Sequence, residues 1–167
     1  MTRWLIYAFG GLVVLVVGVL AVGWLLPVGH SASASQVVDG DRDRVFRAIA
    51  EFSRYPEWRT DVRRVEVSGP EGVGQMVRED GANGEIPYRV EAFDPPGRLV
   101  MRITGDLPFG GTWTYVLTPD GEDRTRVTIT EDGEVYNPLF RVMARFVFGY
   151  TGTMETYLRD LARRFGG

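Results

Sequence analysis

The feature that most constrains the fold is the C-terminal stretch of residues 137–165, in which apolar residues recur at three- and four-residue steps. This spacing predicts an amphipathic helix with one buried face, with Asn137 as its N-cap and Pro138 at its first helical position. At about 1.5 Å per residue, the helix would be roughly 40 Å long. An apolar face of that length needs a large partner surface. We therefore expect a long terminal helix that lies across a sheet.

The sequence before this helix predicts strands that are separated by turns rich in Gly and Pro. Apolar and polar side chains alternate in several of these strands, as they do along residues 113–118. One apolar face per strand is typical of an antiparallel sheet that is covered on one side, and the connections are too short for helical crossovers. The predicted strands are residues 35–38, 62–68, 75–80, 85–94, 99–105, 112–118 and 126–135.

Two short helices are predicted between the first and second strands. Asp41 is a suitable N-cap for the first of them, and the proline of Tyr55-Pro56 marks its end. Residues 56–59 can start the second helix, from which Trp58 would close one end of the core.

An apolar segment without a single charge, residues 4–26, begins the chain. It exceeds the ~20 residues that cross a hydrocarbon layer of ~30 Å, and it predicts a single-pass membrane anchor followed by a linker. We therefore divide the chain into an anchor and linker, residues 1–34, and a soluble domain, residues 35–167. A cleaved signal peptide is the alternative, because residues 32–34 resemble a cleavage site. The apolar segment is longer than the ~7–15 residues usual for a signal.

The side of the membrane follows from the few basic residues near the segment. Arg3 precedes it, and the first arginines after it are Arg42 and Arg44. Because basic residues favour the cytoplasmic side, we expect the N-terminus inside and the soluble domain outside the cytoplasm.

Composition excludes several classes of function. The net charge of −3, without a basic run, offers no surface for nucleic acid. Disulfides and cysteine-based metal sites are excluded because the chain has no cysteine. The single histidine, His30, falls in the predicted linker, where we expect it to be exposed. Three converging ligands for a metal cannot be found, so no metal and no cofactor are expected.

Several short motifs, taken in order, resemble the START-like superfamily, which includes polyketide cyclase/dehydrase and lipid transport proteins. The motifs are Val45-Phe46, Tyr55-Pro56-x-Trp58, residues 93–99 (FDPPGRL), Gly111-Thr112-Trp113-x-Tyr115 and Glu131-x-Gly133 through Asn137-Pro138-Leu139. The resemblance covers about residues 35–165. It implies an α+β helix-grip fold, in which a curved seven-stranded antiparallel sheet surrounds the C-terminal helix and encloses a cavity. It also implies apolar ligands such as sterols, lipids or polyketides. The membrane anchor departs from the usual soluble form.

The side chains that would line such a cavity come from the inward faces of the strands and from the first half of the terminal helix. We take as candidate ligand-binding residues Tyr88, Met101, Trp113, Tyr115, Glu131, Phe140, Met143 and Val147. An ordinary packed core is the alternative for the apolar members. The first half of the helix is apolar almost all round, and Gly149 and Gly152 interrupt its middle. That half could therefore move as a gate around Phe140, Met143, Val147 and Phe148.

Glu131 is the most informative acid in the sequence. If Val127 and Ile129 face the core, alternation points Glu131 inward as well. A buried carboxylate is costly unless it is paired, so it would mark a site. The alternatives are a solvated position at the rim or an ion pair with Arg145.

These observations favour a membrane-tethered domain that binds an apolar small molecule or lipid, with the membrane and that ligand as its partners. An enzyme of the cyclase/dehydratase type, using Glu131 with Tyr115 or Tyr88, is the first alternative. The second is a non-catalytic interaction module whose cavity is filled by side chains. Binding is preferred because few polar groups converge at the inward positions, and no catalytic residue is assigned.

Overall fold

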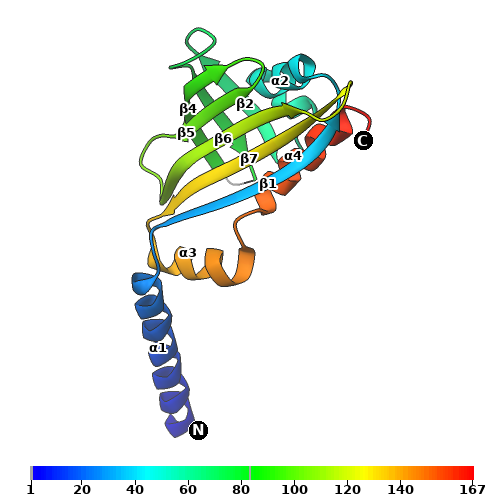
Figure 1. The fold of residues 1–167 in the computed structure, drawn as a ribbon. Helices are drawn as coiled ribbons and strands as arrows, with labels where there is room; N and C mark the ends of the chain where they lie inside the picture. Colours follow the sequence, from blue (N-terminus) through cyan, green and yellow to red (C-terminus); the bar gives the residue numbers. More distant parts are fainter. Residues whose placement is uncertain (1, 83) are drawn as a thin grey trace.

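The computed structural model describes residues 2–82 and 84–167 and consists of a curved sheet, a helix held inside it and an N-terminal helix that extends away from both (Figure 1). The predicted turn around residues 81–84 includes residue 83, which lies outside the described residues. The side chains of Arg3 and of the predicted gate residue Phe148 also lie outside the description.

Seven strands form a single antiparallel sheet in the order β1-β7-β6-β5-β4-β3-β2. The strands are β1 (Gly29–Asp39), β2 (Val62–Ser68), β3 (Met76–Gly81), β4 (Gly84–Asp94), β5 (Arg98–Ile103), β6 (Phe109–Pro119) and β7 (Arg124–Val135). Figure 1 shows the sheet curving around the C-terminal helix α4 (Gly152–Arg164). The predicted α+β helix-grip fold is confirmed.

The core lies between the concave face of the sheet and α4. Alternation along β6 and β7 buries Leu117, Val127 and Ile129 on this face. Met154 and Tyr157 of α4 are fully buried against it. The helix therefore supplies the apolar layer that an antiparallel sheet with one buried face requires.

Two short helices close one end of the sheet. Asp41 caps α2 (Arg42–Ala50) by accepting a hydrogen bond of 2.9 Å from the Arg44 backbone nitrogen. The second predicted helix is displaced, because the chain forms instead a 3₁₀ helix, η1 (Phe52–Glu57), with Pro56 inside it. Trp58 follows η1 and packs edge-on against Tyr157 of α4, which agrees with its predicted position at the end of the core.

The predicted linker is wrong in its second part. β1 begins at Gly29 instead of Ser35, and it pairs with β7 along its whole length, from Gly29 opposite Glu134 to Asp39 opposite Arg124. Small residues dominate the first half of β1, so no apolar alternation marked it as a strand. Only residues 26–28 separate β1 from the N-terminal helix.

The predicted continuous helix over residues 137–165 is also wrong. The chain forms α3 (Pro138–Met143), a π-helical turn η2 (Ala144–Phe148) and, after a break, α4. Gly149 lies at the break with φ of 71°, a conformation that favours glycine and ends the helix. Because of this break, α3 leaves the sheet and lies beside the end of the N-terminal helix (Figure 1).

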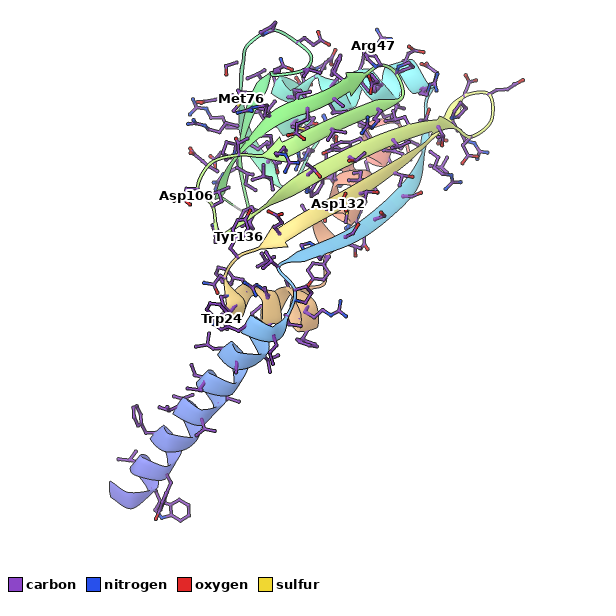
Figure 2. The ribbon with its side chains drawn as sticks, turned by 60° about the vertical axis from the view of Figure 1, so that its left-hand side comes forward. Trp24, Arg47, Met76, Asp106, Asp132 and Tyr136 are labelled. Atoms are coloured by element: carbon purple, nitrogen blue, oxygen red, sulfur yellow. The ribbon has the colours of Figure 1, made fainter. Side chains whose placement is uncertain are left out.

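The N-terminal helix α1 (Thr2–Leu25) contains a stretch, Tyr7–Leu25, that is long and apolar enough to cross a membrane, with a mean hydropathy of 2.5. An N-terminal signal sequence can meet the same criterion of length and hydropathy. Figure 2 shows the side chains of α1 standing free along most of the helix, with Trp24 near the domain. Helices with apolar side chains on every side need an apolar environment around them.

Arg141 of α3 joins α1 to the folded domain. Its guanidinium donates hydrogen bonds of 3.1 Å to the carbonyl oxygens of both Gly23 and Leu26 at the end of α1. It also donates to the carbonyls of Val135 and Tyr136 at the end of β7, at 2.8 and 2.9 Å. The cation thus satisfies helix-end carbonyls that lack partners within the helix.

The contact between the two helices is close. A side chain at Gly23 would collide with the backbone carbonyl of Pro138, so only glycine allows the end of α1 to approach the start of α3 this way. Asn137 fixes the start of α3 by accepting a hydrogen bond of 2.9 Å from the Leu139 backbone nitrogen. We refer to the contact of Arg141 and Pro138 with the end of α1 as the helix clamp.

Candidate functional site

A cavity of about 300 Å³ lies between the sheet, the segment that follows η1 and the start of α4, and we call it the inner cavity. Its walls are mainly aromatic and aliphatic side chains of β4, β5 and β6. The predicted residues among its walls are Tyr88, Met101, Trp113, Tyr115 and Glu131. Pairing explains why they meet, because Met101 lies opposite Trp113, and Trp113 lies opposite Glu131, on successive strands.

The tyrosines of the inner cavity are neutral hydrogen-bonding groups. Burial raises the pKa of both Tyr88 and Tyr115 well above the ordinary value near 10. Each hydroxyl therefore keeps its proton at neutral pH. The cavity walls can offer a bound molecule hydroxyl donors and acceptors beside apolar rings.

A buried ion cluster forms the other polar part of the inner cavity. Arg59 donates to Asp61 at 3.1 and 2.8 Å and to both carboxylate oxygens of Glu79 at 3.0 Å. Its guanidinium lies 4.9 Å from the ring centroids of both Tyr55 and Tyr157. Burial raises the pKa of Glu79, and the charge of Arg59 opposes that rise. We call Arg59, Asp61 and Glu79 the ion cluster.

The sequence analysis missed the ion cluster. Glu79 shares its alternation with the buried residues Gln75 and Val77, and this pattern places it on the inward face of the strand. Arg59 had no comparable signal, because it follows η1, where no strand or regular helix fixes the direction of a side chain.

A second cavity of about 570 Å³, the outer cavity, opens beside α3. Two predicted residues, Phe140 and Met143, line it. The outer and inner cavities share three wall residues, Phe109, Glu131 and Thr153. The two cavities therefore adjoin each other at Glu131.

Glu131 lies at this junction, and its side chain is 21% exposed. Burial raises its pKa to about 7, and a hydrogen bond from Trp113 opposes the rise. The predicted inward direction agrees with the structure, whereas Arg145 is an exposed residue of η2 and forms no ion pair with Glu131 among the described residues. A carboxyl group with a pKa near neutrality can both accept and donate a proton under physiological conditions.

His30 is not the exposed linker residue that the sequence predicted. It lies in β1 and its Nε2 atom is 3.8 Å from Oε1 of Glu131. Its ring stacks on Tyr150 with a centroid distance of 3.9 Å. Gly133 is opposite His30 in the sheet, and any side chain there would collide with the imidazole. Burial lowers the pKa of His30, and the charge of Asp132 opposes this effect.

The remaining predicted residue, Val147, lines neither cavity and is 62% exposed. It belongs to an apolar surface on α3 and η2, beside the helix clamp. The exposed members of this surface are Leu139, Phe140, Phe146 and Val147. The predicted residues thus fall into three groups, in the inner cavity, in the outer cavity and on this surface, and their roles remain predictions.

Among residues 2–82 and 84–167, no group of three or more His, Asp or Glu side chains is arranged to hold a metal ion. The site offers aromatic rings, hydroxyl groups, one buried ion cluster and one carboxyl group with a raised pKa. Chemically, it can enclose an apolar molecule and exchange a proton or hydrogen bond with it at Glu131.

Comparison with solved structures finds the same fold in proteins of low sequence identity. Norcoclaurine synthase from Thalictrum flavum is 13% identical, with a TM-score of 0.66 over 82% of this chain and 86% of that chain. A START superfamily protein from Mycobacterium smegmatis is 17% identical, with a TM-score of 0.67 over 81% and 97%. Major latex-like protein 151 from Panax ginseng is 14% identical, with a TM-score of 0.66 over 84% and 99%.

A comparison with curated protein sequences finds no match. Residues 29–166, however, match the sequence pattern of the family described as "Polyketide cyclase / dehydrase and lipid transport". The match begins at the first residue of β1 and ends just after α4. The chain therefore belongs to the polyketide cyclase/dehydrase and lipid transport family, within the START-like superfamily.

Proposed function

We propose that this protein is tethered to a membrane by α1 and binds an apolar small molecule or lipid in the inner cavity. The observation that carries the proposal is the inner cavity of about 300 Å³, walled by Met101, Trp113 and other apolar side chains. This volume is at the lower end of the range for small-molecule sites, which are mainly apolar with a few polar groups. The unfilled volume of the inner cavity favours binding over an interaction module whose cavity is filled by side chains.

The tether is supported by how α1 joins the domain. Cleavage after Ala34 would remove residues 29–34, which pair with residues 129–134 of β7. It would also remove two of the carbonyl acceptors of Arg141, a residue that is only 8% exposed. A segment that contributes to the fold in this way is better suited to an anchor that is retained than to a signal that is removed.

The position of the outer cavity supports a route from the membrane. The apolar surface on α3 and η2 lies beside the end of α1, so a bilayer that contains α1 would meet it. Phe140 and Met143 line the outer cavity next to this surface, and Glu131 lies where the two cavities adjoin. An apolar molecule could pass from the bilayer to the inner cavity with little contact with water.

We further propose, as the basic residues around the segment predict, that the domain lies outside the cytoplasm. Arg42 is in the first turn of α2, which follows the end of β1 that is distant from α1. A reporter fused after Gly167 tests this topology. Activity of a reporter that works only in the cytoplasm would contradict it.

Binding can be tested with the full chain in nanodiscs of neutral lipid and a fluorescent fatty-chain probe. Met143→Arg places a charge in the wall of the outer cavity, and Trp113→Ala removes a ring from the inner cavity. We expect both variants to weaken probe binding. Val73→Arg is the matched control, because Val73 is 68% exposed in the β2–β3 connection and lines neither cavity.

The result that contradicts the proposal is equal probe affinity in all four proteins, with the fold verified by circular dichroism. The cavity residues would then be ordinary core. Mass spectrometry of small molecules that copurify with the full chain would identify the natural ligand in the positive case.

An enzyme of the cyclase/dehydratase type is the second candidate. It is favoured by one observation, the pKa of about 7 at Glu131, because a side chain that can accept and return a proton suits such a reaction. Conversion of a poly-β-ketone substrate by the wild type, and its loss in Glu131→Gln, would support this candidate. If neither protein converts the substrate, binding alone is favoured.

A further inference from the structure

Glu131 is placed differently from every other acid of the two cavities. Among the described residues, it is the only charged side chain that lines both of them. Asp61 and Glu79 line only the inner cavity, and both are bonded to Arg59. Glu134 lines only the outer cavity and accepts a hydrogen bond of 2.7 Å from the Tyr136 hydroxyl.

No cationic side chain neutralises Glu131 within the described part of the chain. The basic residue of the inner cavity is Arg59, and the ion cluster already engages its donors with two carboxylates. The nearest basic group to Glu131 is His30, at 3.8 Å. Burial lowers the pKa of His30, so the imidazole is neutral at pH 7 and cannot balance a carboxylate.

The walls next to Glu131 are suited to a cation as well. Trp113 is paired with Glu131 across the sheet, and the rings of Tyr88 and Tyr115 line the same cavity. Aromatic faces attract cationic groups, most strongly where water is excluded. The inner cavity also carries more acidic than basic side chains, namely Asp61, Glu79 and Glu131 against Arg59.

We propose that the ligand carries a protonated amine, with its ammonium group bound at Glu131 and its apolar body in the inner cavity. This inference rests on the proposed binding function and specifies the chemical class of the ligand. An ammonium group would make charge-assisted hydrogen bonds to the carboxylate, which are stronger than those between neutral groups. A ligand with a carboxylate would instead be repelled by Glu131 and by the surplus acid of the ion cluster.

The proposal also implies a pH dependence. Glu131 must be ionised to pair with an ammonium group, so affinity should rise as the pH increases through about 7. The other titratable groups that face this region are His30 from β1, Glu134 and Tyr150 at the outer cavity, and Tyr88, Tyr115 and the ion cluster across the inner cavity. Of these, His30 is the group besides Glu131 that can change charge near neutral pH.

The test uses three probes that differ only in their polar group: naphthylmethylamine, naphthylmethanol and naphthoic acid. Each is titrated calorimetrically into the full chain in a nonionic detergent at pH 8. We expect the amine to bind at least about tenfold more tightly than the alcohol, and the acid to bind most weakly. In Glu131→Gln, the preference for the amine should fall below about twofold, while the affinity for the alcohol stays the same.

Glu122→Gln is the matched control, because it removes an exposed acid of the β6–β7 connection that lines neither cavity and leaves Glu131 in place. It should retain the preference for the amine. Equal binding of the amine and the alcohol by the wild type overturns the inference but leaves the proposed binding function intact. Retention of the preference in Glu131→Gln overturns the assignment to this residue. If none of the probes binds, with the fold verified, the proposed function fails together with the inference.

Discussion

Arg59 offers the most direct test of how the inner cavity is stabilised. Its side chain is only 6% exposed, and the side chains of its partners Glu79 and Asp61 are 10% and 16% exposed. Replacement by methionine, Arg59→Met, keeps the apolar stem but leaves two buried carboxylates without a cation. Removing one partner of a buried ion pair destabilises a protein by about 3–5 kcal/mol. We expect a loss of stability in this range at neutral pH.

The second variant separates the charge effect from lost packing. Arg59→Met/Glu79→Met removes the more deeply buried carboxylate together with its cation, and it should recover a large part of the lost stability. Arg63→Met is the matched control. Arg63 pairs with Asp80 at the surface, where its side chain is 72% exposed, so the change should cost less than about 1 kcal/mol.

The free energy of unfolding is measured by urea denaturation of the full chain in nonionic detergent, with tryptophan fluorescence and circular dichroism as signals. Urea is preferred to guanidinium because it leaves ion pairs unscreened. The loss of stability in Arg59→Met should be smaller near pH 5. Protonation of Glu79 removes its negative charge, and the free-energy cost of burying that charge disappears with it. A loss below about 1 kcal/mol at neutral pH, or an equal loss in Arg63→Met, would refute the reasoning.

Three further predictions concern other parts of the molecule. Burial raises the pKa of Glu131 from 4.5 to about 7, so the free energy of unfolding should fall by up to about 3 kcal/mol as the pH rises between these values. Urea denaturation should show that this pH dependence is lost in Glu131→Gln. Arg141→Met removes the bonds of the helix clamp, so hydrogen exchange should accelerate in α3 but not in α4. A chain that starts at Gly29 should unfold cooperatively, whereas one that starts at Ser35 lacks half of β1 and should show no sharp transition by circular dichroism.

Alternation made most of the sheet predictable. Residues such as Leu117 and Ile129 repeat at every second position, and this period fixes which side chains face the core. The first half of β1 escaped prediction because residues 29–34 are mostly small and polar. Its strand conformation depends on hydrogen bonds to β7, and pairing between distant segments leaves no local pattern.

The candidate site was predictable where its residues lie on strands with clear alternation, and not elsewhere. Trp113 and Glu131 follow from the alternation of their strands, whereas the proximity of His30 to Glu131 follows from the register between β1 and β7. Arg59 lies outside regular structure, so its direction depends on tertiary packing against Tyr157. Residues placed by strand period could be predicted, and residues placed by contacts between elements could not.

The stretch that forms α3, η2 and α4 has the helical spacing of apolar residues that the sequence analysis found, but it does not form one continuous helix. The apolar side chains of residues 137–165 do follow a helical period, which Gly149 interrupts. The period could not reveal that α3 and α4 face different partners, α1 and the sheet. The apolar character all round the first half of the stretch was the signal of this second partner.

The helix clamp also bears on how far the domain can travel. A long flexible tether would let a binding domain swing between two membranes and carry cargo across the gap. Here residues 26–28 are the whole connection, and Arg141 bonds the end of α1 to the domain. With α1 in a bilayer, the domain would keep one fixed orientation relative to the surface of that bilayer. A ligand would then bind to and leave a domain that stays at one membrane. Transfer to a second protein or membrane would require that partner to approach the domain.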